Sequence, residues 1–241
     1  MCLIVLAHRA SERFPLIIAA NRDEDYERPS LPAHFWEGDE IAGGRDALQG
    51  GSWLAVTRSG RFAAVTNLRG AVRAPESRSR GELVTEFVRA GATPAEYTAA
   101  VAARQADYAG FHLLVGEVGG ELALLSGSAL PLEPGIHGLS NAPLGVRWPK
   151  VDLAAESVRG ALQSAAKEEV ANHLLRLLRN APTHADPTRD LFIHGERYGT
   201  RASTVIVAGG NEVLFAEQNY GPRGVPAGGR NELRFPLFGR R

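Results

Sequence analysis

Residues 1–24 read MCLIVLAHRASERFPLIIAANRDE, and the two apolar runs in this stretch decide the fold. Leu3–Ala7 and Leu16–Ala20 are each about as long as a strand and carry no polar side chain. Such runs are typical of central strands in a sheet that is covered on both faces. The segment between them, residues 8–15, is polar and ends in a proline, which indicates a turn. We therefore expect a buried hairpin at the start of the chain.

Antiparallel pairing of this hairpin about a turn centred near Glu12 places Cys2 opposite Arg22. The polar segment Asn21-Arg22-Asp23-Glu24 follows the second apolar run, so it lies beside the first residues of the first strand. A thiol, a guanidinium, an amide and carboxylates thus come together at one end of the hairpin.

The rest of the chain alternates strand hairpins with pairs of helices. Short glycine-containing turns join the paired strands, and Thr93-Pro94-Ala95-Glu96 has the residues of a capping box with proline in the first turn. Gly43-Gly44 and Gly50-Gly51 indicate loops in which the backbone turns tightly or approaches a neighbour closely. We expect hairpins over 53–57 with 62–66, 111–116 with 121–126 and 203–208 with 212–217, a short strand over 136–141, and helices over 81–90, 93–105, 151–163 and 167–180.

This order of elements predicts an α+β fold, a four-layer α/β/β/α sandwich in which helices lie outside two antiparallel sheets. No internal repeat or linker interrupts residues 1–241, so we expect a single domain. From about residue 221 the chain is rich in Gly, Pro and Arg, and we expect this tail to be irregular.

The composition is that of a globular protein, with 44% hydrophobic and 22% charged residues. The 27 basic and 27 acidic residues balance, which excludes the positive field that holds nucleic acid or anionic membranes without specificity. No apolar run reaches the ~20 residues that span a bilayer, and the apolar start is too short for a signal peptide. A single cysteine excludes an intrachain disulfide and a cysteine-based metal cluster. We expect a cytoplasmic protein whose thiol stays reduced.

The one cysteine, Cys2, follows Met1, and a small residue at this position permits removal of the initiator methionine. Cleavage would give Cys2 a free α-amino group with a pKa of about 8, next to the thiol of the same residue. That amine can accept the thiol's proton and later return it to a leaving group, so that one residue supplies nucleophile and base. The alternative is that Cys2 is a small buried residue at the start of a strand.

The charged residues opposite Cys2 suit a role in its chemistry. A guanidinium at Arg22 would lower the pKa of the thiol and favour the thiolate, and a carboxylate at Asp23 would orient the α-ammonium group. The alternative is a polar turn that follows a buried strand.

Further candidates lie at predicted strand ends. Asn67 and Asn141 carry amide N–H groups that suit an oxyanion site, where one donor is worth about 3–4 kcal/mol; turn formation is the alternative use of asparagine. Arg201 precedes the last hairpin, where it would hold a carboxylate or lie on the surface. His137, beside a Gly-Leu-Ser-Asn segment, and Trp53 are candidates for the wall of a pocket. The histidines lack a metal-binding spacing such as HExxH, so we expect no metal site.

Several motifs follow one another along the chain. They are Met1-Cys2-Leu3-Ile4-Val5, Ala20-Asn21-Arg22-Asp23-Glu24, Gly43-Gly44-Arg45-Asp46, Gly50-Gly51-Ser52-Trp53-Leu54-Ala55-Val56, Phe62-Ala63-Ala64-Val65-Thr66-Asn67, Gly138-Leu139-Ser140-Asn141 and Tyr198-Gly199-Thr200-Arg201. Together they resemble the NRDE-motif family, also called the transport-and-Golgi-organisation family, from Met1 to about Glu217. That family is similar in fold to N-terminal-nucleophile (Ntn) hydrolases and, more distantly, to the penicillin and bile-salt amidases.

The resemblance implies a catalytic site around the processed cysteine, which Cys2 matches. Arg22 and Asp23 would match the amidase arginine and aspartate, although the order here is Asn-Arg-Asp and not Arg-Asn-x-Asp. We expect Asn21 and Glu24, in the same segment, to contact the substrate.

The resemblance also places three distant residues in the site. In the amidase order, the oxyanion, amine-contacting and site arginine residues correspond to Asn67, Asn141 and Arg201. The resemblance therefore implies a hydrolase that cleaves a linear C–N amide bond of a small or acylated substrate and requires no cofactor.

Alternative functions follow from the same residues. Members of the family have been linked to secretory-pathway organisation and to haem trafficking, so the second hypothesis is a protein that carries haem or an acyl lipid in the same cleft without hydrolysis. A third is a structural role in which the polar cluster is a relic. We expect a small-molecule substrate or ligand, with haem as one candidate, and no nucleic acid partner.

Overall fold

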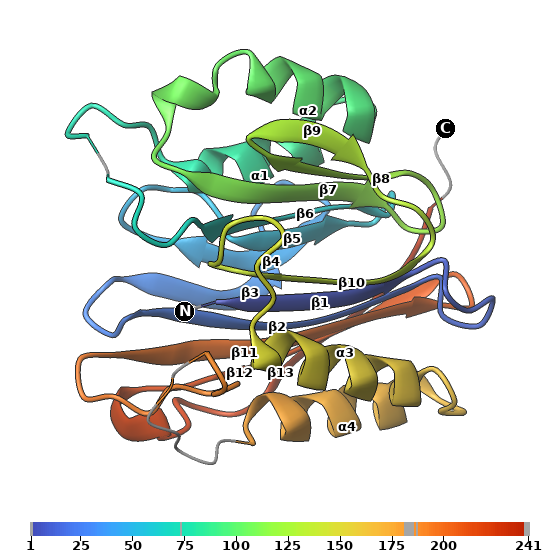
Figure 1. The fold of residues 1–241 in the computed structure, drawn as a ribbon. Helices are drawn as coiled ribbons and strands as arrows, with labels where there is room; N and C mark the ends of the chain where they lie inside the picture. The colour runs from blue at the N-terminus through green and yellow to red at the C-terminus, as the bar shows by residue number, and fades with distance from the viewer. Residues whose placement is uncertain (1, 73, 181–185, 187, 239–241) are drawn as a thin grey trace. The chain divides into compact units, whose positions relative to one another are not determined.

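Antiparallel pairing organises the chain into two units in a computed structural model that describes residues 2–72, 74–180, 186 and 188–238. Unit 1 consists of Met1–Arg28, Pro134–Ser140 and Gly145–Pro236, and unit 2 of Pro29–Glu133, Asn141–Leu144 and Leu237–Arg241. In the described part of the chain, each unit has one antiparallel sheet and two α-helices, which Figure 1 labels. The expectation of a single domain stays a prediction.

Unit 1 is built on the hairpin of β1 (Leu3–His8) and β2 (Leu16–Asp25). The register pairs Leu3 with Asn21, and its continuation brings Cys2 opposite Arg22, as expected. Both strands are apolar and buried along most of their length, which explains why they lie in the interior of the sheet. Over the described residues the sheet runs in the order β10-β1-β2-β11-β12-β13, with β10 at Gly135–Ser140, β11 at Tyr198–Gly209, β12 at Glu212–Asn219 and β13 at Asn231–Pro236.

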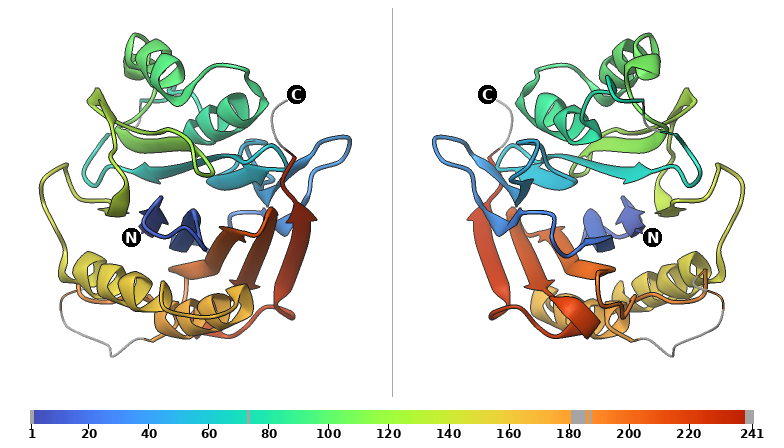
Figure 2. Two further views of the ribbon diagram at one scale, coloured as in Figure 1. Left: turned by 90° about the vertical axis from the view of Figure 1, so that its right-hand side faces the viewer. Right: turned by 90° about the vertical axis from the view of Figure 1, so that its left-hand side faces the viewer.

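The helices α3 (Pro149–Ala161) and α4 (Lys167–Leu178) cover this sheet. Proline at the first position of α3 suits a helix start, where its missing N–H has no partner to lose. α3 contacts β1 and β10, while α4 contacts β2 and β11, and the two helices lie side by side in Figures 1 and 2. α4 directs Leu174 and Leu178 into the core. Each fully buried leucine stabilises the fold by about 1.5–3 kcal/mol relative to an exposed one.

Unit 2 contains a second antiparallel sheet, which over the described residues runs β3-β4-β5-β6-β7-β8-β9. Two of its hairpins, β5 with β6 and β7 with β8, have the pairings that the sequence predicts. The strand bounds are β3 Ser30–Phe35, β4 Ile41–Asp46, β5 Leu54–Thr57, β6 Arg61–Asn67, β7 Phe111–Glu117, β8 Leu122–Ser126 and β9 Ser128–Pro131.

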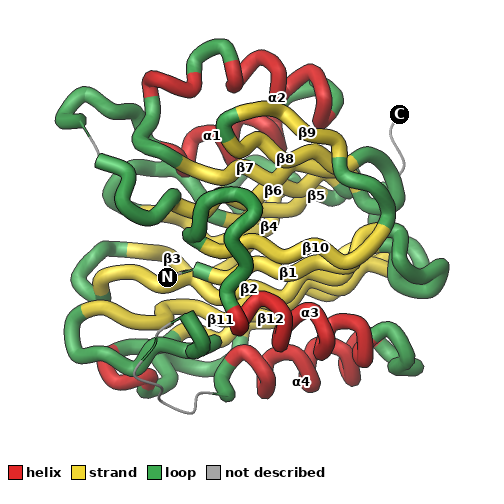
Figure 3. Tube along the Cα trace, in the orientation of Figure 1, coloured by secondary structure: helices red, strands yellow, loops and turns green. Residues whose placement is uncertain are grey.

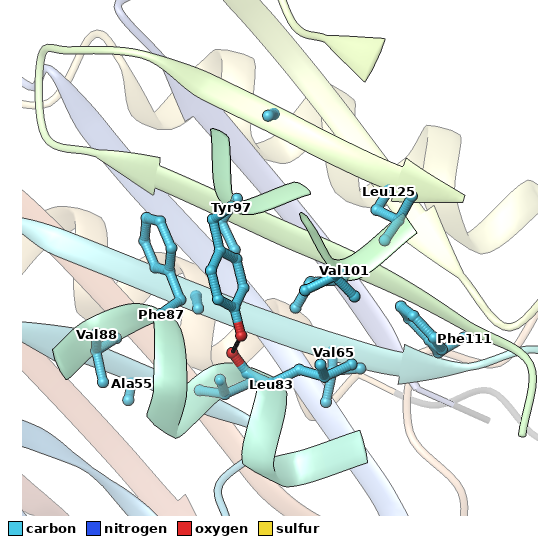
Figure 4. Packing of buried hydrophobic residues seen from close by; sticks show 14 of the residues in the cluster. Ala55, Val65, Leu83, Phe87, Val88, Tyr97, Val101, Phe111 and Leu125 are labelled. Atoms are coloured by element: carbon cyan, nitrogen blue, oxygen red, sulfur yellow. Dashed lines mark hydrogen bonds between the residues drawn. The ribbon is translucent and has the colours of Figure 1, made fainter. Parts of the chain in front are cut away.

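The helices α1 (Arg80–Arg89) and α2 (Pro94–Ala102) pack on the sheet of unit 2, and Figure 3 shows them in red beside the yellow strands. The capping box is confirmed, since Thr93 and Glu96 each accept from the other's backbone N–H. In the core between these helices, the Tyr97 hydroxyl donates to the Leu83 carbonyl at 2.8 Å, as Figure 4 shows. The ring of Tyr97 lies 5.2 Å from that of Phe87, between centroids. The α+β class with two antiparallel sheets is confirmed.

Gly43 and Gly44 lie inside β4, which corrects the expectation of a loop there. The reason for glycine is the close approach of the neighbouring strands. A Cβ on Gly43 would lie 2.6 Å from the carbonyl oxygen of Leu54, and one on Gly44 would lie 3.0 Å from that of Leu31. The part of the prediction that concerned close approach is confirmed.

The tail from residue 221 is not irregular throughout, because β13 pairs with β12 and buries Phe235. The Gly-, Pro- and Arg-rich composition of the tail does not indicate this strand. The pairing depends on an available edge of β12 and not on local residues alone. The edge strands β3 and β9 were also missed by the sequence analysis. The residues of β9 are all exposed, so they show no alternation of apolar and polar side chains.

The substitution Gly43→Ala tests the close approach of β4 to β5. We expect it to lower the free energy of unfolding by about 1–3 kcal/mol, because the added methyl group has no room beside the Leu54 carbonyl. Chemical denaturation would measure the change. Gly160→Ala in α3 is the matched control, since nothing lies within 4 Å of its added Cβ and alanine favours a helix. Equal effects of the two substitutions would contradict the packing explanation.

Candidate active site

Cys2 lies immediately before β1 and is partly buried. Its Sγ lies 3.7 Å from the carbonyl oxygen of Asp23, a distance that suits a thiol hydrogen bond. Burial raises the pKa of the Cys2 thiol and the Asp23 carboxylate raises it further, whereas the Arg22 guanidinium lowers it. The expected influence of Arg22 is present, but burial outweighs it. The thiol is therefore protonated at neutral pH and needs a base before it can act as a nucleophile.

Asp23 is held firmly beside the thiol. Its side chain is 5% exposed, and Oδ1 accepts a hydrogen bond of 2.6 Å from the Thr200 hydroxyl. The same hydroxyl oxygen accepts from the backbone N–H of Ile193 at 2.9 Å, so the rotamer of Thr200 is fixed from both sides. A buried carboxylate with a fixed donor is suited to orienting a cationic group.

Arg22 and Glu24 lie next to each other at the end of β2. Arg22 Nη2 is 3.5 Å from Glu24 Oε2, and the same oxygen is 3.8 Å from Arg28 Nε. The other oxygen of Glu24 accepts from the backbone N–H of Asp25 at 3.0 Å. These partly exposed ion pairs contribute little stability, but they restrict where the Arg22 guanidinium can point. A contact of Glu24 with substrate stays a prediction.

Asn21 is buried and bonds distant segments of unit 1, and the expectation that it contacts substrate stays a prediction. The residue is 0% exposed. Its Nδ2 donates to the carbonyls of Leu178 and Leu191 at 2.9 and 2.7 Å, and its Oδ1 accepts from the Ser203 hydroxyl at 2.6 Å. Both amide hydrogens are therefore engaged in joining β2 to the end of α4 and to the segment before β11.

Arg201 bonds backbone carbonyls through one nitrogen of its guanidinium, and the expectation that it holds a carboxylate stays a prediction. Its Nη1 donates to the carbonyls of Asp25, Tyr26 and Arg28 at 3.1, 3.0 and 2.5 Å. Burial lowers the pKa of Arg201, and the nearby Arg22 guanidinium lowers it further. The guanidinium thus fixes the turn that leaves β2, close to Arg22.

Asn67 and Asn141 come together in unit 2. Nδ2 of Asn141 donates to the backbone carbonyl of Asn67 at 2.6 Å, and Asn141 is 7% exposed. Within the described residues, Oδ1 of Asn141 is buried and has no hydrogen-bond partner. Asn67 is exposed at the end of β6, and Trp53 precedes β5 with its carbonyl bound to the N–H of Val65. The expected contacts of these three residues with substrate stay predictions.

His112 holds the segment that carries Asn141. Its Nε2 is 2.8 Å from the carbonyl of Ala142, and its Nδ1 is 2.8 Å from Oγ of Ser126. Because a carbonyl can only accept, Nε2 carries the hydrogen and Nδ1 accepts from the serine hydroxyl. Burial lowers the pKa of His112, although the hydrogen bond to Ala142 opposes the shift. The imidazole is therefore neutral at neutral pH.

His137 lies on β10 opposite Leu6, in unit 1, and is partly exposed. Its place in the wall of a pocket stays a prediction. The described residues contain no group of three or more His, Cys, Asp or Glu side chains that could hold a metal ion. They also contain no helix of the length and apolar character that a membrane span requires.

Two residues near Cys2 were missed by the sequence analysis. Lys150, the second residue of α3, is 0% exposed and interacts electrostatically with Asp23 and Cys2. Tyr198 at the start of β11 donates from its hydroxyl to the Asp23 carbonyl at 3.4 Å, and burial raises its pKa, so the phenol stays neutral. No local signal marks Lys150, because lysine in the first turn of a helix is ordinarily exposed.

The likeness to known proteins covers nearly the whole chain. Residues 1–222 match the family model for Transport and Golgi organisation 2. The chain belongs to this family. A Transport and Golgi organization protein 2 homolog from Homo sapiens is 31% identical over 240 residues, which cover 86% of this chain and 87% of the human protein. A homolog from Mus musculus is 30% identical over 239 residues, with coverage of 86% and 87%.

Solved structures establish the fold of this Transport and Golgi organisation 2 family member. The mutant C2A conjugated bile acid hydrolase from Clostridium perfringens has a TM-score of 0.52 and 9% sequence identity, and covers 97% of this chain and 92% of its own. A second variant of that hydrolase has a TM-score of 0.56 with the same identity and coverage. At this identity the likeness concerns the fold alone, which is the Ntn-hydrolase-like fold that the sequence predicts.

The neutral imidazole of His112 makes stability depend on pH. An unfolded histidine binds a proton as the pH falls below about 6.5. Folded His112 has a lowered pKa, so it binds its proton only at a lower pH. Its stabilising effect is therefore complete above about pH 6.5 and is lost as the pH falls through the folded value. We expect the Tm to fall between about pH 7.5 and pH 5, and His112→Gln to reduce that fall.

Thermal unfolding followed by circular dichroism across this pH range would measure the effect. His173→Gln is the matched control, because His173 is exposed on α4 and its loss should leave the pH dependence unchanged. A fall of the same size in His112→Gln and in the unmodified protein would contradict the assignment.

Proposed function

We propose that this chain is a cysteine hydrolase of linear amide bonds, in which Cys2 is the nucleophile after removal of Met1. One observation carries the proposal: the thiol stands beside Asp23, a buried carboxylate whose position is fixed by Thr200. Met1 itself lies outside the described residues. Removal of Met1 would leave the new α-amino group on the residue whose sulfur already contacts Asp23.

Because the Cys2 thiol is protonated, the mechanism requires a base. Since burial keeps the Cys2 thiol neutral, an amine with a pKa of about 8 on the same residue is a suitable base. The amine takes the thiol proton, and the sulfur attacks the substrate carbonyl carbon to form a C–S bond. The C–N bond then breaks, and the α-ammonium returns the proton to the leaving amine. Water hydrolyses the resulting thioester to release the acid and the free thiol.

The charged groups at the end of β2 would have two different roles in catalysis. Asp23 would orient the α-ammonium, since its carboxylate is buried and held by Thr200. Arg22, directed by Glu24, would stabilise the thiolate at the moment of attack. The oxyanion of the tetrahedral intermediate needs amide donors, and the sequence-based assignment of Asn67 and Asn141 to that role stays a prediction.

The comparison with the bile acid hydrolase supports this proposal. The C2A substitution indicates that the bacterial enzyme also has a cysteine at its second position. The name of that enzyme describes hydrolysis of a conjugated bile acid. An amide of a small or acylated compound is therefore the substrate class that we propose here.

Turnover of chromogenic amides tests the proposal. We would assay the purified chain with N-acyl p-nitroanilides of graded acyl length and establish the loss of Met1 by intact mass. We expect release of p-nitroaniline and a transient acyl adduct on the protein. Cys2→Ala should lower kcat/KM by about 1,000-fold or more, because removal of a nucleophile abolishes the covalent route. Cys2→Ser, with its weaker nucleophile, should fold equally well and act slowly.

Two outcomes would contradict hydrolysis by Cys2. One is full retention of Met1, since the α-amine could then not serve as base. The other is unchanged turnover in Cys2→Ala. A haem titration in the same series addresses the second hypothesis, since tight binding with a Soret shift and no amide turnover would favour a carrier over a hydrolase.

A further inference from the structure

A histidine and a serine form a hydrogen-bonded pair in unit 2, whereas Cys2 belongs to unit 1. The antiparallel register of β7 and β8 pairs Leu113 with Leu125. Its continuation by one residue pairs His112 with Ser126, so these two residues are cross-strand neighbours. Nδ1 of His112 and Oγ of Ser126 lie 2.8 Å apart. The pairing of the strands thus brings a hydroxyl to an imidazole that is 14 residues away in the chain.

The imidazole of His112 is oriented by a bond to its second nitrogen. Nε2 lies 2.8 Å from the carbonyl oxygen of Ala142, which can only accept, so Nε2 carries the hydrogen. The lone pair of Nδ1 therefore points to Ser126, whose hydroxyl donates to it. A base that is held by a third group and accepts a hydrogen bond from a hydroxyl is the arrangement that activates a nucleophilic serine.

The surroundings of His112 suit a base at neutral pH. Its side chain is 2% exposed, and burial lowers its pKa, so the imidazole is neutral and able to accept a proton. Its neighbours Leu113 and Val115 pack in the core with residues of α1 and α2. Because successive side chains of a strand point to opposite faces, His112 and Leu113 lie on opposite faces of the sheet. The pair therefore lies on the face of this sheet that the two helices do not cover.

The hydroxyl of Ser126 is the accessible end of the pair. Ser126 is the last residue of β8 and is partly exposed, unlike His112. The next residue, Gly127, has a φ of 74°, and a Cβ added to it would meet no heavy atom of the described residues within 4 Å. A donor that serves only to satisfy a buried imidazole has no need to reach solvent, whereas a nucleophile must be reached by its substrate. The base is thus shielded and its serine is open, with room beside it.

We propose that Ser126 and His112 form a second nucleophilic site, which takes up the acyl group of a small carboxylic ester. Oγ of Ser126 attacks the ester carbonyl carbon and forms a C–O bond, while Nδ1 of His112 takes the hydroxyl proton. The bond from that carbon to the alcohol oxygen then breaks, and the imidazolium returns the proton to the leaving alkoxide. Water, with His112 again as the base, hydrolyses the acyl-serine and releases the acid and the free hydroxyl.

The third member of the site favours esters over amides. The Ala142 carbonyl orients His112 but carries no net charge, so it stabilises an imidazolium less than the carboxylate of a catalytic triad does. Such a pair suits a substrate whose leaving group departs easily, and an alkoxide leaves more readily than an amine. The site does not depend on the chemistry that we propose for Cys2.

A fluorophosphonate tests the nucleophile directly. Oγ of Ser126 attacks its phosphorus, an O–P bond forms, the P–F bond breaks, and His112 takes the proton as fluoride leaves. We would treat the full chain carrying Cys2→Ala, so that the thiol cannot react, and locate the adduct by peptide mass spectrometry. We expect an adduct on Ser126 in the folded protein and none in protein unfolded in urea. The same folded protein should release p-nitrophenol from p-nitrophenyl acetate.

Three further variants in this background make the test specific. Ser126→Ala should abolish the adduct, and His112→Gln should slow its formation about 100-fold or more, because the base is lost. Ser128→Ala is the matched control, since Ser128 is exposed and pairs with Ser126 between β8 and β9. Both ring nitrogens of His112 are engaged by other groups, so loss of the Ser128 hydroxyl should leave the labelling rate unchanged.

The outcomes either support the site or overturn it. An adduct that forms on Ser126 only in the folded protein, and slowly in folded His112→Gln, supports it. No adduct on the folded protein, an adduct only at other residues, or equal labelling rates with and without His112 overturns it. Circular dichroism establishes which variants fold. If His112→Gln does not fold, equal labelling of Ser126 in native and urea-unfolded protein overturns the proposal. Amide turnover is measured with Cys2 present, so failure of that reaction is distinguished from failure of this site.

Discussion

The antiparallel pairing of β1 with β2 is the constraint on which the candidate site depends. Leu3 pairs with Asn21, so the residue before the first strand lies opposite the residue after the apolar part of the second. A shift of this register by one residue would turn every side chain of β2 to the other face. The pairing thus decides whether the thiol meets Asp23 or an aliphatic side chain.

Successive side chains of β2 point to opposite faces of the sheet, so its four polar residues lie in two pairs with different partners. Asn21 and Asp23 share one face, on which Asn21 bonds the end of α4 and Asp23 bonds Thr200. Arg22 and Glu24 share the other face and form an ion pair. Asn21 therefore joins distant segments of the chain, although its neighbour Arg22 influences the sulfur.

Burial and nearby positive charge have opposite effects on the pKa of the Cys2 thiol. Burial raises the pKa of Cys2, while the Arg22 guanidinium favours the thiolate. A thiol in such a site stays protonated and unreactive until a base removes its proton or a nearby charge changes. Removal of Met1 would supply a base, whereas Arg22 is in place before any processing. The fold shared with the bile acid hydrolase does not by itself determine the substrate.

The sequence by itself determined much of the local structure of this protein, but not the strands β3, β4, β9 and β13. Apolar runs, glycine-containing turns and the capping box at Thr93 and Glu96 are short-range signals, and they predicted the hairpins and the helices. The neighbourhood of Cys2 and Arg22 also followed, since a hairpin register depends only on the turn between its strands. Family motifs indicated the fold class and a candidate nucleophile.

Only the tertiary structure decided what individual polar side chains do. Asn21 bonds Leu178 and Leu191, which lie far away in the chain, and Arg201 bonds the carbonyls of a turn after β2. Lys150 is buried in the first turn of α3, and Asp23 and Asp190, from other elements, interact with it electrostatically. A local pattern specifies which backbone conformation a segment prefers, whereas the partner of a buried polar atom is determined by which distant segments pack against it.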